Sequence, residues 1–348
     1  MARPALQMFS LDQSEEWDHI VRSFSCYDTY YLSGYVKAFH IHGDGIPLLF
    51  YYNDGLNRGI NVCMKRSIIE DPHFKGILDD DRYFDLASPY GYGGWLIEGD
   101  TEQLFRDYER WCVKNNIVSE FVRFHPMLGN QEAVEDHYDV IALGDTVAMD
   151  LSSPEAIWEN ITSKNRNMIR KAEKNGIRIY NGRFPQILTD FIKIYNSTMD
   201  NDDAEEYYYF REPFYNSILE DLPFNSQVFW AEKDGKVIAA SIMLECNGLM
   251  NYHLSGSLQE FRSLASTNLL LYKAAVWGCE HGMKSLHLGG GVASGEDSLF
   301  KFKRSFYKGG LHKFYIGRKV FDSDVYQELT MMRSDSIENV NYFPVYRG

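Results

Sequence analysis

The sequence has few cysteines and no arrangement that would link them. Its five cysteines are scattered through 348 residues, and none belongs to a C-x-x-C pair. Structural zinc sites and disulfide frameworks use closely spaced cysteines, so we predict no metal site and a protein of the reducing cytoplasm. No stretch approaches the ~20 apolar residues of a transmembrane helix, so no membrane span is expected.

An excess of basic residues and the usual phosphate motifs are also missing. The formal net charge is −14, whereas binding to the DNA backbone needs clustered Lys and Arg. Residues 289–295 are rich in glycine but follow neither the P-loop order nor G-x-G-x-x-G. We therefore predict no DNA binding. Two local basic segments, 164–178 and 301–308, remain as candidate anion-binding surfaces.

Aromatic residues are abundant, with 24 Tyr and 22 Phe. This composition favours a folded protein with aromatic-lined clefts over a disordered one. The length suggests about two domains, each large enough to bury a core of its own.

The predicted elements occur in the same order in both halves of the chain. The first half has strands at 47–52, 59–65 and 83–87, a helix at 102–115 and a strand at 120–124. The second half has strands at 227–232, 237–246 and 250–254, a helix at 266–281 and a strand at 285–288. This repetition implies an internal duplication. The fold class is α/β (mixed with α+β), with twisted mixed sheets.

The boundary between the two halves is predicted near residues 144–153. The segment that follows, Ser152-Ser-Pro-Glu155, has the N-cap, the proline and the acidic first turn of a helix start. We predict an N-terminal domain over 1–147 and a C-terminal domain with the candidate site over 148–315. Residues 316–348 form a helix and tail that can pack back on the first domain.

Five segments together resemble a known family. They are SPYGYGG at 88–94, RFHP at 123–126 with Asn130, RNMIRKAEKNG at 166–176, YHLSGS at 252–257 and FKRSF at 302–306. In this order they are similar to FemABX-type aminoacyltransferases, which belong to the GNAT superfamily of N-acetyltransferase-like proteins. The resemblance runs from about residue 27 to 315.

The resemblance implies a pair of GNAT-like domains and a specific reaction. In that family an amino acid passes from aminoacyl-tRNA to an amine, typically in a peptidoglycan precursor during cell wall biogenesis. The chain departs from the cross-bridge enzymes because it lacks a long charged heptad segment that could form their helical arm. The peptidoglycan substrate is therefore left open.

The catalytic candidates lie in the last of these segments. Amide formation needs a neutral amine near the carbonyl carbon and a group that stabilises the oxyanion. Phe302, Lys303 and Phe306 match the family's F-K-x-x-F pattern, which assigns Lys303 to the acyl ester or the developing oxyanion. The alternative is an exposed lysine on a basic helix. No serine or cysteine lies in a nucleophile elbow, so direct transfer without an acyl-enzyme is expected.

Donor binding is predicted on a basic helix. Arg166, Arg170 and Lys174 recur at i, i+4 and i+8, so they share one face. The match to the family's R-N-x-x-R-K-A pattern implies that they hold phosphates of tRNA or of a nucleotide carrier. A solvated helix face is the alternative. Tyr208 is expected on the same donor side.

A second donor candidate is acyl-CoA. GNAT enzymes that use it carry Q/R-x-x-G-x-G/A before a helix whose N-terminal amides bind pyrophosphate. The equivalent residues here, 261–268, contain no glycine. Arg262, an N-capping Ser266 and Asn268 still offer an anion site, although Ser266 can equally be a cap and no more.

The acceptor side is predicted mainly in the first half. The candidates are Tyr35, Lys37, Tyr90, Tyr92, Arg123, His125 and Tyr252. Tyr90 and Tyr92 can stack on a base, sugar or peptide, or pack inside a turn. Tyr35 and Lys37 match an aromatic-x-Lys position that lies near the acceptor in the family. Arg123 and His125 alternate at a strand end, where His125 can shuttle a proton or serve as a structural residue.

These patterns together predict an N-acyltransferase. We expect aminoacyl-tRNA as co-substrate, an amine of a cell-envelope or nucleotide-linked precursor as acceptor, and no permanently bound cofactor. One alternative is an acyl-CoA-dependent N-acyltransferase that acts on an amino sugar or a related amine. Another is a non-catalytic module that binds a peptide or nucleotide sugar. The oligomeric state is left open.

Overall fold

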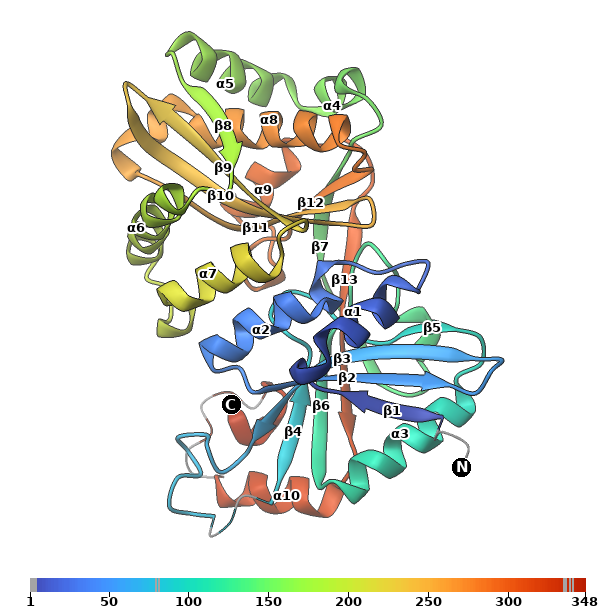
Figure 1. The fold of residues 1–348 in the computed structure, drawn as a ribbon. Coiled ribbons are helices and arrows are strands. Elements are labelled where there is room, and N and C mark those ends of the chain that lie inside the picture. Colours follow the sequence, from blue (N-terminus) through green and yellow to red (C-terminus); the bar gives the residue numbers. More distant parts are fainter. Residues whose placement is uncertain (1–4, 79, 81, 334–336, 338, 340) are drawn as a thin grey trace. The chain divides into compact units, whose positions relative to one another are not determined.

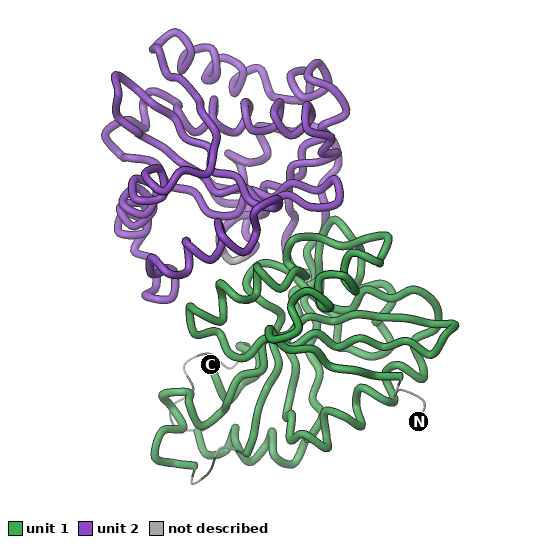
Figure 2. Tube along the Cα trace, in the orientation of Figure 1, with its two compact units in different colours: residues 1–143, 314–348 green, residues 144–313 purple. Residues whose placement is uncertain are grey.

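The computed structural model describes residues 5–78, 80, 82–333, 337, 339 and 341–348. The chain divides into two compact units (Figures 1 and 2). Unit 1 contains residues 1–143 and 314–348, and unit 2 contains residues 144–313. None of the helices in the described part of the chain is both long and apolar enough to cross a bilayer.

Unit 1 is built on a mixed sheet. In spatial order its strands are β1 (Leu6–Phe9), β2 (Ile46–Asn53), β3 (Arg58–Ser67), β4 (Phe84–Ala87), β6 (Ile117–Arg123) and β13 (His312–Val320). A short strand, β5 (Leu96–Glu98), pairs with β3. Neighbours are antiparallel except for β4 and β6, which are parallel. The helices are α1 (Ser14–Arg22), α2 (Ser33–His42), α3 (Glu102–Lys114) and α10 (Ser323–Met332).

Unit 2 has a sheet of the same design. Its strands are β8 (Arg178–Gly182), β9 (Ser226–Lys233), β10 (Lys236–Cys246), β11 (Leu249–Ser257), β12 (Ser285–Gly289) and β7 (Asp139–Asp150). Only β11 and β12 are parallel. The helices are α4 (Pro154–Asn160), α5 (Ser163–Lys174), α6 (Pro185–Asn201), α7 (Glu212–Asp221), α8 (Ser266–Glu280) and α9 (Ser298–Arg304).

The two sheets therefore share strand order and strand direction, which confirms the predicted mixed α/β architecture with a duplicated design. The final strand of each sheet comes from an unexpected part of the sequence. β7 follows β6 in the chain but pairs through residues 147–150 with β12 of unit 2. β13 follows β12 and α9 but pairs through residues 316–320 with β6 of unit 1. The duplicated halves thus exchange their last strands.

Local sequence explains the elements around the site in unit 2. Thr162 caps α5 by accepting a hydrogen bond from Asn165 N, and Ser153 caps α4 in the same way. Asp234 and Gly235 both have positive φ, as a tight β9–β10 hairpin requires. α8, with α5 and α4 beside it, packs on one face of the sheet, while α6 packs on the other (Figure 1).

The parallel strands of unit 2 separate soon after they pair. β11 and β12 are joined only through Leu249–Asn251 and Ser285–His287. After these residues the two strands no longer pair with each other. The carboxyl ends of both strands therefore lie at an opening in the sheet. The glycine-rich loop follows directly after β12.

Candidate active site

The loop after β12 needs glycine for steric reasons. Gly289 has φ +79°, a backbone conformation that favours glycine. A Cβ on Gly291 would lie 2.1 Å from Gly295 O and 2.5 Å from Asp297 Oδ1. The backbone therefore folds back on itself too closely for any side chain at Gly291. This close approach brings the start of α9 against the end of β12.

Asp297 fixes the start of α9. Its carboxylate accepts hydrogen bonds from Phe300 N at 2.8 Å and from Val292 N at 3.2 Å. These backbone donors lower the pKa of Asp297, so it is ionised at neutral pH. The same side chain caps the helix and ties it to the loop.

Lys303 extends from α9 to the end of β12. Its Nζ donates a hydrogen bond of 2.7 Å to Gly290 O. Burial lowers the pKa of Lys303 to about 8, an effect that Asp297 partly offsets. The side chain as a whole is half-buried, so the ammonium is enclosed while the residue keeps contact with solvent. An ammonium has three donors, and Gly290 uses one of them.

Phe302 and Phe306 form an aromatic pair on the same helix. Their ring centroids lie 5.3 Å apart at an interplanar angle of 79°. Phe306 is fully buried in the core of unit 2, while Phe302 is half-buried. Phe306 therefore anchors α9, and Phe302 is the ring that remains near the surface beside Lys303.

The start of α8 differs from its expected form. Ser266 is not the N-cap, because that position belongs to Ala265, which has φ 60° and no side-chain cap. Ser266 is instead the first helical residue and is buried. Asn268 Nδ2 donates to Asn165 Oδ1 at 2.8 Å and links α8 to α5. Arg262 is exposed in the preceding 3-10 helix, Gln259–Leu264.

The basic row on α5 divides into two kinds of residue. The Arg166 guanidinium donates to the carbonyl oxygens of Trp158 at 3.2 Å and Ile161 at 3.0 Å, so it caps the end of α4. Arg170 is exposed and lies 5.1 Å from the centre of the Trp158 ring. Lys174 is exposed at the last residue of α5. Arg166 is thus engaged within unit 2, whereas Arg170 and Lys174 face solvent.

The remaining donor candidate, Tyr208, belongs to the short 3-10 helix Glu206–Tyr208 and is half-buried. Its neighbour Tyr207 makes an edge-to-face contact with it, at 5.4 Å between the ring centroids.

Five acceptor candidates come together in unit 1. The Tyr35 hydroxyl donates to Tyr90 O at 2.6 Å, and Arg123 Nε donates to Gly91 O at 2.9 Å. The Tyr92 ring lies 5.4 Å from that of His125. The segment around Tyr90 and Tyr92 is therefore held by side chains from α2 and β6.

Two of these residues are fully buried and support the cluster from within. Tyr35 has no exposed surface, and neither does His125. His125 Nδ1 accepts from Met127 N, which leaves Nε2 to donate to Asp28 Oδ2 at 2.8 Å. A proton shuttle to solvent through His125 does not fit this enclosed pair, because both side chains have no exposed surface.

The other two acceptor candidates lie apart from this cluster. Lys37 is exposed on α2. Tyr252 belongs to β11 of unit 2, where its hydroxyl donates to Ser255 Oγ at 2.6 Å and burial raises its pKa to about 12. Tyr252 therefore shares a unit with Lys303 rather than with the tyrosines of unit 1.

Sequence reasoning missed three supporting residues, of which two lie in the tyrosine cluster of unit 1 and one lies beside Lys303 in unit 2. Asp28 pairs with His125 across 97 positions, and the ring of Tyr30 contacts those of Tyr35 and Tyr92. Asp297 was not selected either, although Asp297 followed by a hydrophobic run is a helix-start signal. Among the described residues no group of His, Cys, Asp and Glu has the arrangement of a metal site.

Comparison with known proteins adds to this geometry. Residues 163–304 match the family model described as the acetyltransferase (GNAT) domain. This part of unit 2 is a GNAT domain. The match includes α5, α8, the glycine-rich loop and Lys303. The chain is accordingly an acyltransferase, and the predicted resemblance is confirmed at this level. No curated protein matches the sequence.

Solved structures extend the similarity to the whole chain. FemX matches with a TM-score of 0.66 and 12% identity over 92% of this chain and 99% of its own. A conserved protein of unknown function from Bacteroides thetaiotaomicron matches with a TM-score of 0.59 and 11% identity, over 90% and 99%. L-PGS from Bacillus licheniformis matches with a TM-score of 0.57 and 13% identity, over 92% and 94%. At these identities the likeness shows a shared FemX-like GNAT fold.

Proposed function

We propose that the protein transfers an aminoacyl group from aminoacyl-tRNA to an amine of a cell-envelope or nucleotide-linked precursor. The observation that carries the proposal is the Lys303 ammonium, held 2.7 Å from Gly290 O at the opening between β11 and β12. The five segments that resemble FemABX-type aminoacyltransferases support this choice of donor, and the fold shared with FemX is consistent with it. The five free cysteines fit the cytoplasm, where charged tRNA is found.

The proposed reaction forms one C–N bond and breaks one C–O bond. The neutral acceptor amine attacks the ester carbonyl carbon, and the carbonyl oxygen gains negative charge. Lys303 donates to that oxygen with an N–H that Gly290 does not use. Collapse of the intermediate breaks the C–O bond to the ribose of the tRNA. The proton lost by the amine is transferred to the leaving ribose oxygen, which becomes a hydroxyl group.

The identity of the acyl donor is the most specific part of the proposal. Acyl-CoA remains a second candidate because the chain carries a GNAT domain. The start of α8 has no side-chain cap, but residues 261–268 contain no glycine that would let pyrophosphate approach the backbone. Exposed Arg170 and Lys174 provide cations on α5 for the phosphates of a larger donor. These observations favour tRNA.

The donor is tested by mass spectrometry of amine products after incubation with charged tRNA or with acyl-CoA. The proposal predicts a mass increase of one aminoacyl residue with charged tRNA only. Lys303→Met should slow the formation of this product by about 10²–10³-fold, whereas Lys301→Met should leave it unchanged. Lys301 is a matched control because it is an exposed lysine on the same helix. Transfer from acyl-CoA alone, or full turnover by Lys303→Met, would contradict the proposal.

A further inference from the structure

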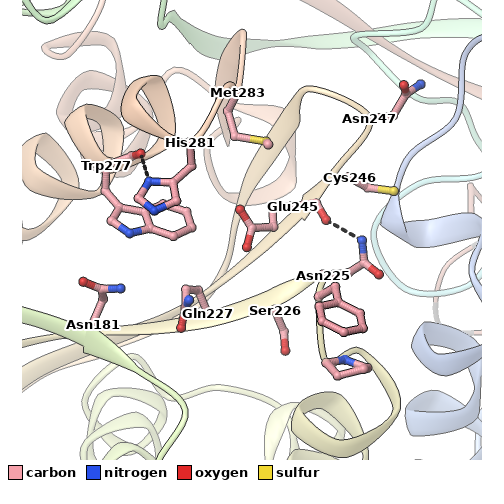
Figure 3. A pocket seen from close by; sticks show the side chains of 12 residues that line it. Asn181, Asn225, Ser226, Gln227, Glu245, Cys246, Asn247, Trp277, His281 and Met283 are labelled. Atoms are coloured by element: carbon pink, nitrogen blue, oxygen red, sulfur yellow. Dashed lines mark hydrogen bonds between the residues drawn. The ribbon is translucent and has the colours of Figure 1, made fainter.

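Unit 2 contains a pocket of about 540 Å³ that the proposed transfer reaction does not use. It is bounded by the start of β9, the end of β10 and the last turn of α8 (Figure 3). Its lining residues are Asn181, Pro223, Phe224, Asn225, Ser226, Gln227, Glu245, Cys246, Asn247, Trp277, His281 and Met283. β10 ends where β11 begins, and β12 starts beside β11, whereas Lys303 lies at the end of β12. The pocket and Lys303 therefore lie at opposite ends of β12.

Glu245 supplies the negative charge of this pocket. The residue is half-buried, and within the described part of the chain its carboxylate accepts no hydrogen bond and forms no ion pair within 4.0 Å. Burial raises the pKa of Glu245 above its ordinary value. A carboxylate that has lost part of its hydration without gaining a partner is stabilised by a cation that enters the pocket.

The basic side chains that influence Glu245 make their hydrogen bonds elsewhere. They are Arg183 and His281. The Arg183 guanidinium donates to the carbonyl oxygens of Pro223 and Leu219, and it holds the end of α7. His281 Nδ1 donates to Trp277 O at 2.8 Å. Neither group neutralises Glu245 by direct contact.

An aromatic wall stands beside the carboxylate. The rings of Trp277 and His281 are stacked, with centroids 3.9 Å apart and planes at 19°. In Figure 3 the Glu245 side chain extends toward Trp277. Indole faces attract cations, and a planar guanidinium can stack on such a ring while its N–H groups reach a carboxylate.

We propose that this pocket is a separate binding site for a small organic cation, with Glu245 as counter-charge and Trp277 as stacking wall. A guanidinium group at the end of a short apolar chain fits best, because Phe224 and Met283 provide apolar surface in the same pocket. This site is distinct from the proposed transfer site and does not depend on the identity of the acyl donor.

The test compares butylguanidinium with butylurea, its neutral isostere, on the full chain. Binding is followed through the indole N–H resonance of Trp277, which is assigned by its loss in Trp277→Phe. Butylguanidinium should shift this resonance in a saturable way and raise the melting temperature. Butylurea should bind about tenfold more weakly, since it lacks the charge that Glu245 and the indole attract.

Two variants test whether butylguanidinium binds in this pocket. Glu245→Gln should weaken butylguanidinium binding by about tenfold while its melting temperature stays at or above that of the wild type, because a half-buried charge is removed. Lys303→Met should bind butylguanidinium as the wild type does. Equal affinity for the two probes, unchanged binding by Glu245→Gln, or loss of binding in Lys303→Met would each overturn the proposal. So would the absence of any saturable shift.

Discussion

At the residue scale, the Lys303 ammonium lies where its charge is costly. Burial lowers its pKa to about 8, while the hydrogen bond to Gly290 O keeps the amine in place. The proposed role requires the protonated form, because only an ammonium can donate with a full positive charge to a developing oxyanion. A general acid–base role would instead use the neutral amine above that pKa.

The pH dependence of transfer distinguishes these roles. If Lys303 acts as a donor, kcat/KM should fall as the pH rises through about 8 in the wild type. Lys303→Arg should retain measurable activity without this descending limb, because arginine stays protonated. Lys303→Met should lose about 10²–10³-fold in kcat, the usual cost of one oxyanion donor. A descending limb that persists unchanged in Lys303→Arg would assign it to another group.

The stability of Lys303→Met provides an independent check on the same residue. The folded-state pKa of Lys303 is depressed from 10.5 to about 8, so the folded protein binds fewer protons than the unfolded chain between these values. The lysine is therefore unfavourable for folding below about pH 8, and its cost disappears as the pH rises toward 10.5. We expect Lys303→Met to melt at or above the wild-type temperature near neutral pH, with the difference shrinking at alkaline pH. A variant that melts lower near neutral pH would show that the lysine contributes net stability.

At the scale of elements, the backbone conformation of the loop between β12 and α9 determines where α9 and its Lys303 lie. Gly291→Ala would place a Cβ 2.1 Å from Gly295 O, so the loop must open and the Asp297 cap must shift. We expect a loss of about 1–3 kcal/mol in the free energy of unfolding, as for other overpacked sites. Transfer activity should fall with it, because Lys303 is carried by the same helix. Chemical denaturation and single-turnover rates measure the two effects.

Gly310→Ala is the matched control for this prediction. A Cβ at Gly310 meets nothing within 4 Å. The variant should keep wild-type stability and activity within measurement error. If Gly291→Ala were equally silent, the close approach of the loop would not be required for the site.

The elements around the site were predicted from local patterns to different degrees. The strands that became β9, β10 and β12 and the helix α8 were predicted because apolar runs and turn residues mark them locally. β8 and β13 were not, since their half-exposed residues give no clear alternation. The N-cap of α8 was misassigned because Ala265 adopts φ 60°, a conformation that nothing in its residue type suggests.

At the scale of the whole molecule, the duplication could be predicted and the strand exchange could not. Two similar orders of elements are a local property of each half. The pairing of β7 with β12 and of β13 with β6 depends on contacts between residues more than a hundred positions apart. The buried pair of Asp28 and His125 is also a long-range contact, because its members are 97 positions apart in segments with no shared motif. Periodicity carries no information about such distant partners.

The exchanged strand returns the chain to unit 1, and the C-terminal residues fasten it there. Arg347 Nε donates to Asp85 Oδ2 at 2.5 Å, and its Nη1 donates to Asp71 Oδ2 at 2.7 Å. Asp85 is completely buried in β4 and is also bonded to Arg66. The closure joins positions 262 apart in the sequence, so it depends on the whole chain being folded.

Arg347→Met tests the importance of this closure. Removal of the guanidinium leaves the buried Asp85 carboxylate with one cation fewer, and we expect a loss of about 3 kcal/mol in the free energy of unfolding. Arg318→Met is the control, because Arg318 pairs with Asp139 at 2.5 Å where both side chains are partly exposed, and such pairs contribute less than about 1 kcal/mol. Denaturant titration measures both, and amide exchange in β4 shows whether the loss is local to Asp85. Equal losses of unfolding free energy in the two variants would mean that burial of the Arg347–Asp85 pair adds no stability. The C-terminal segment would then be held by its apolar contacts, such as that of the Tyr346 ring with Phe74.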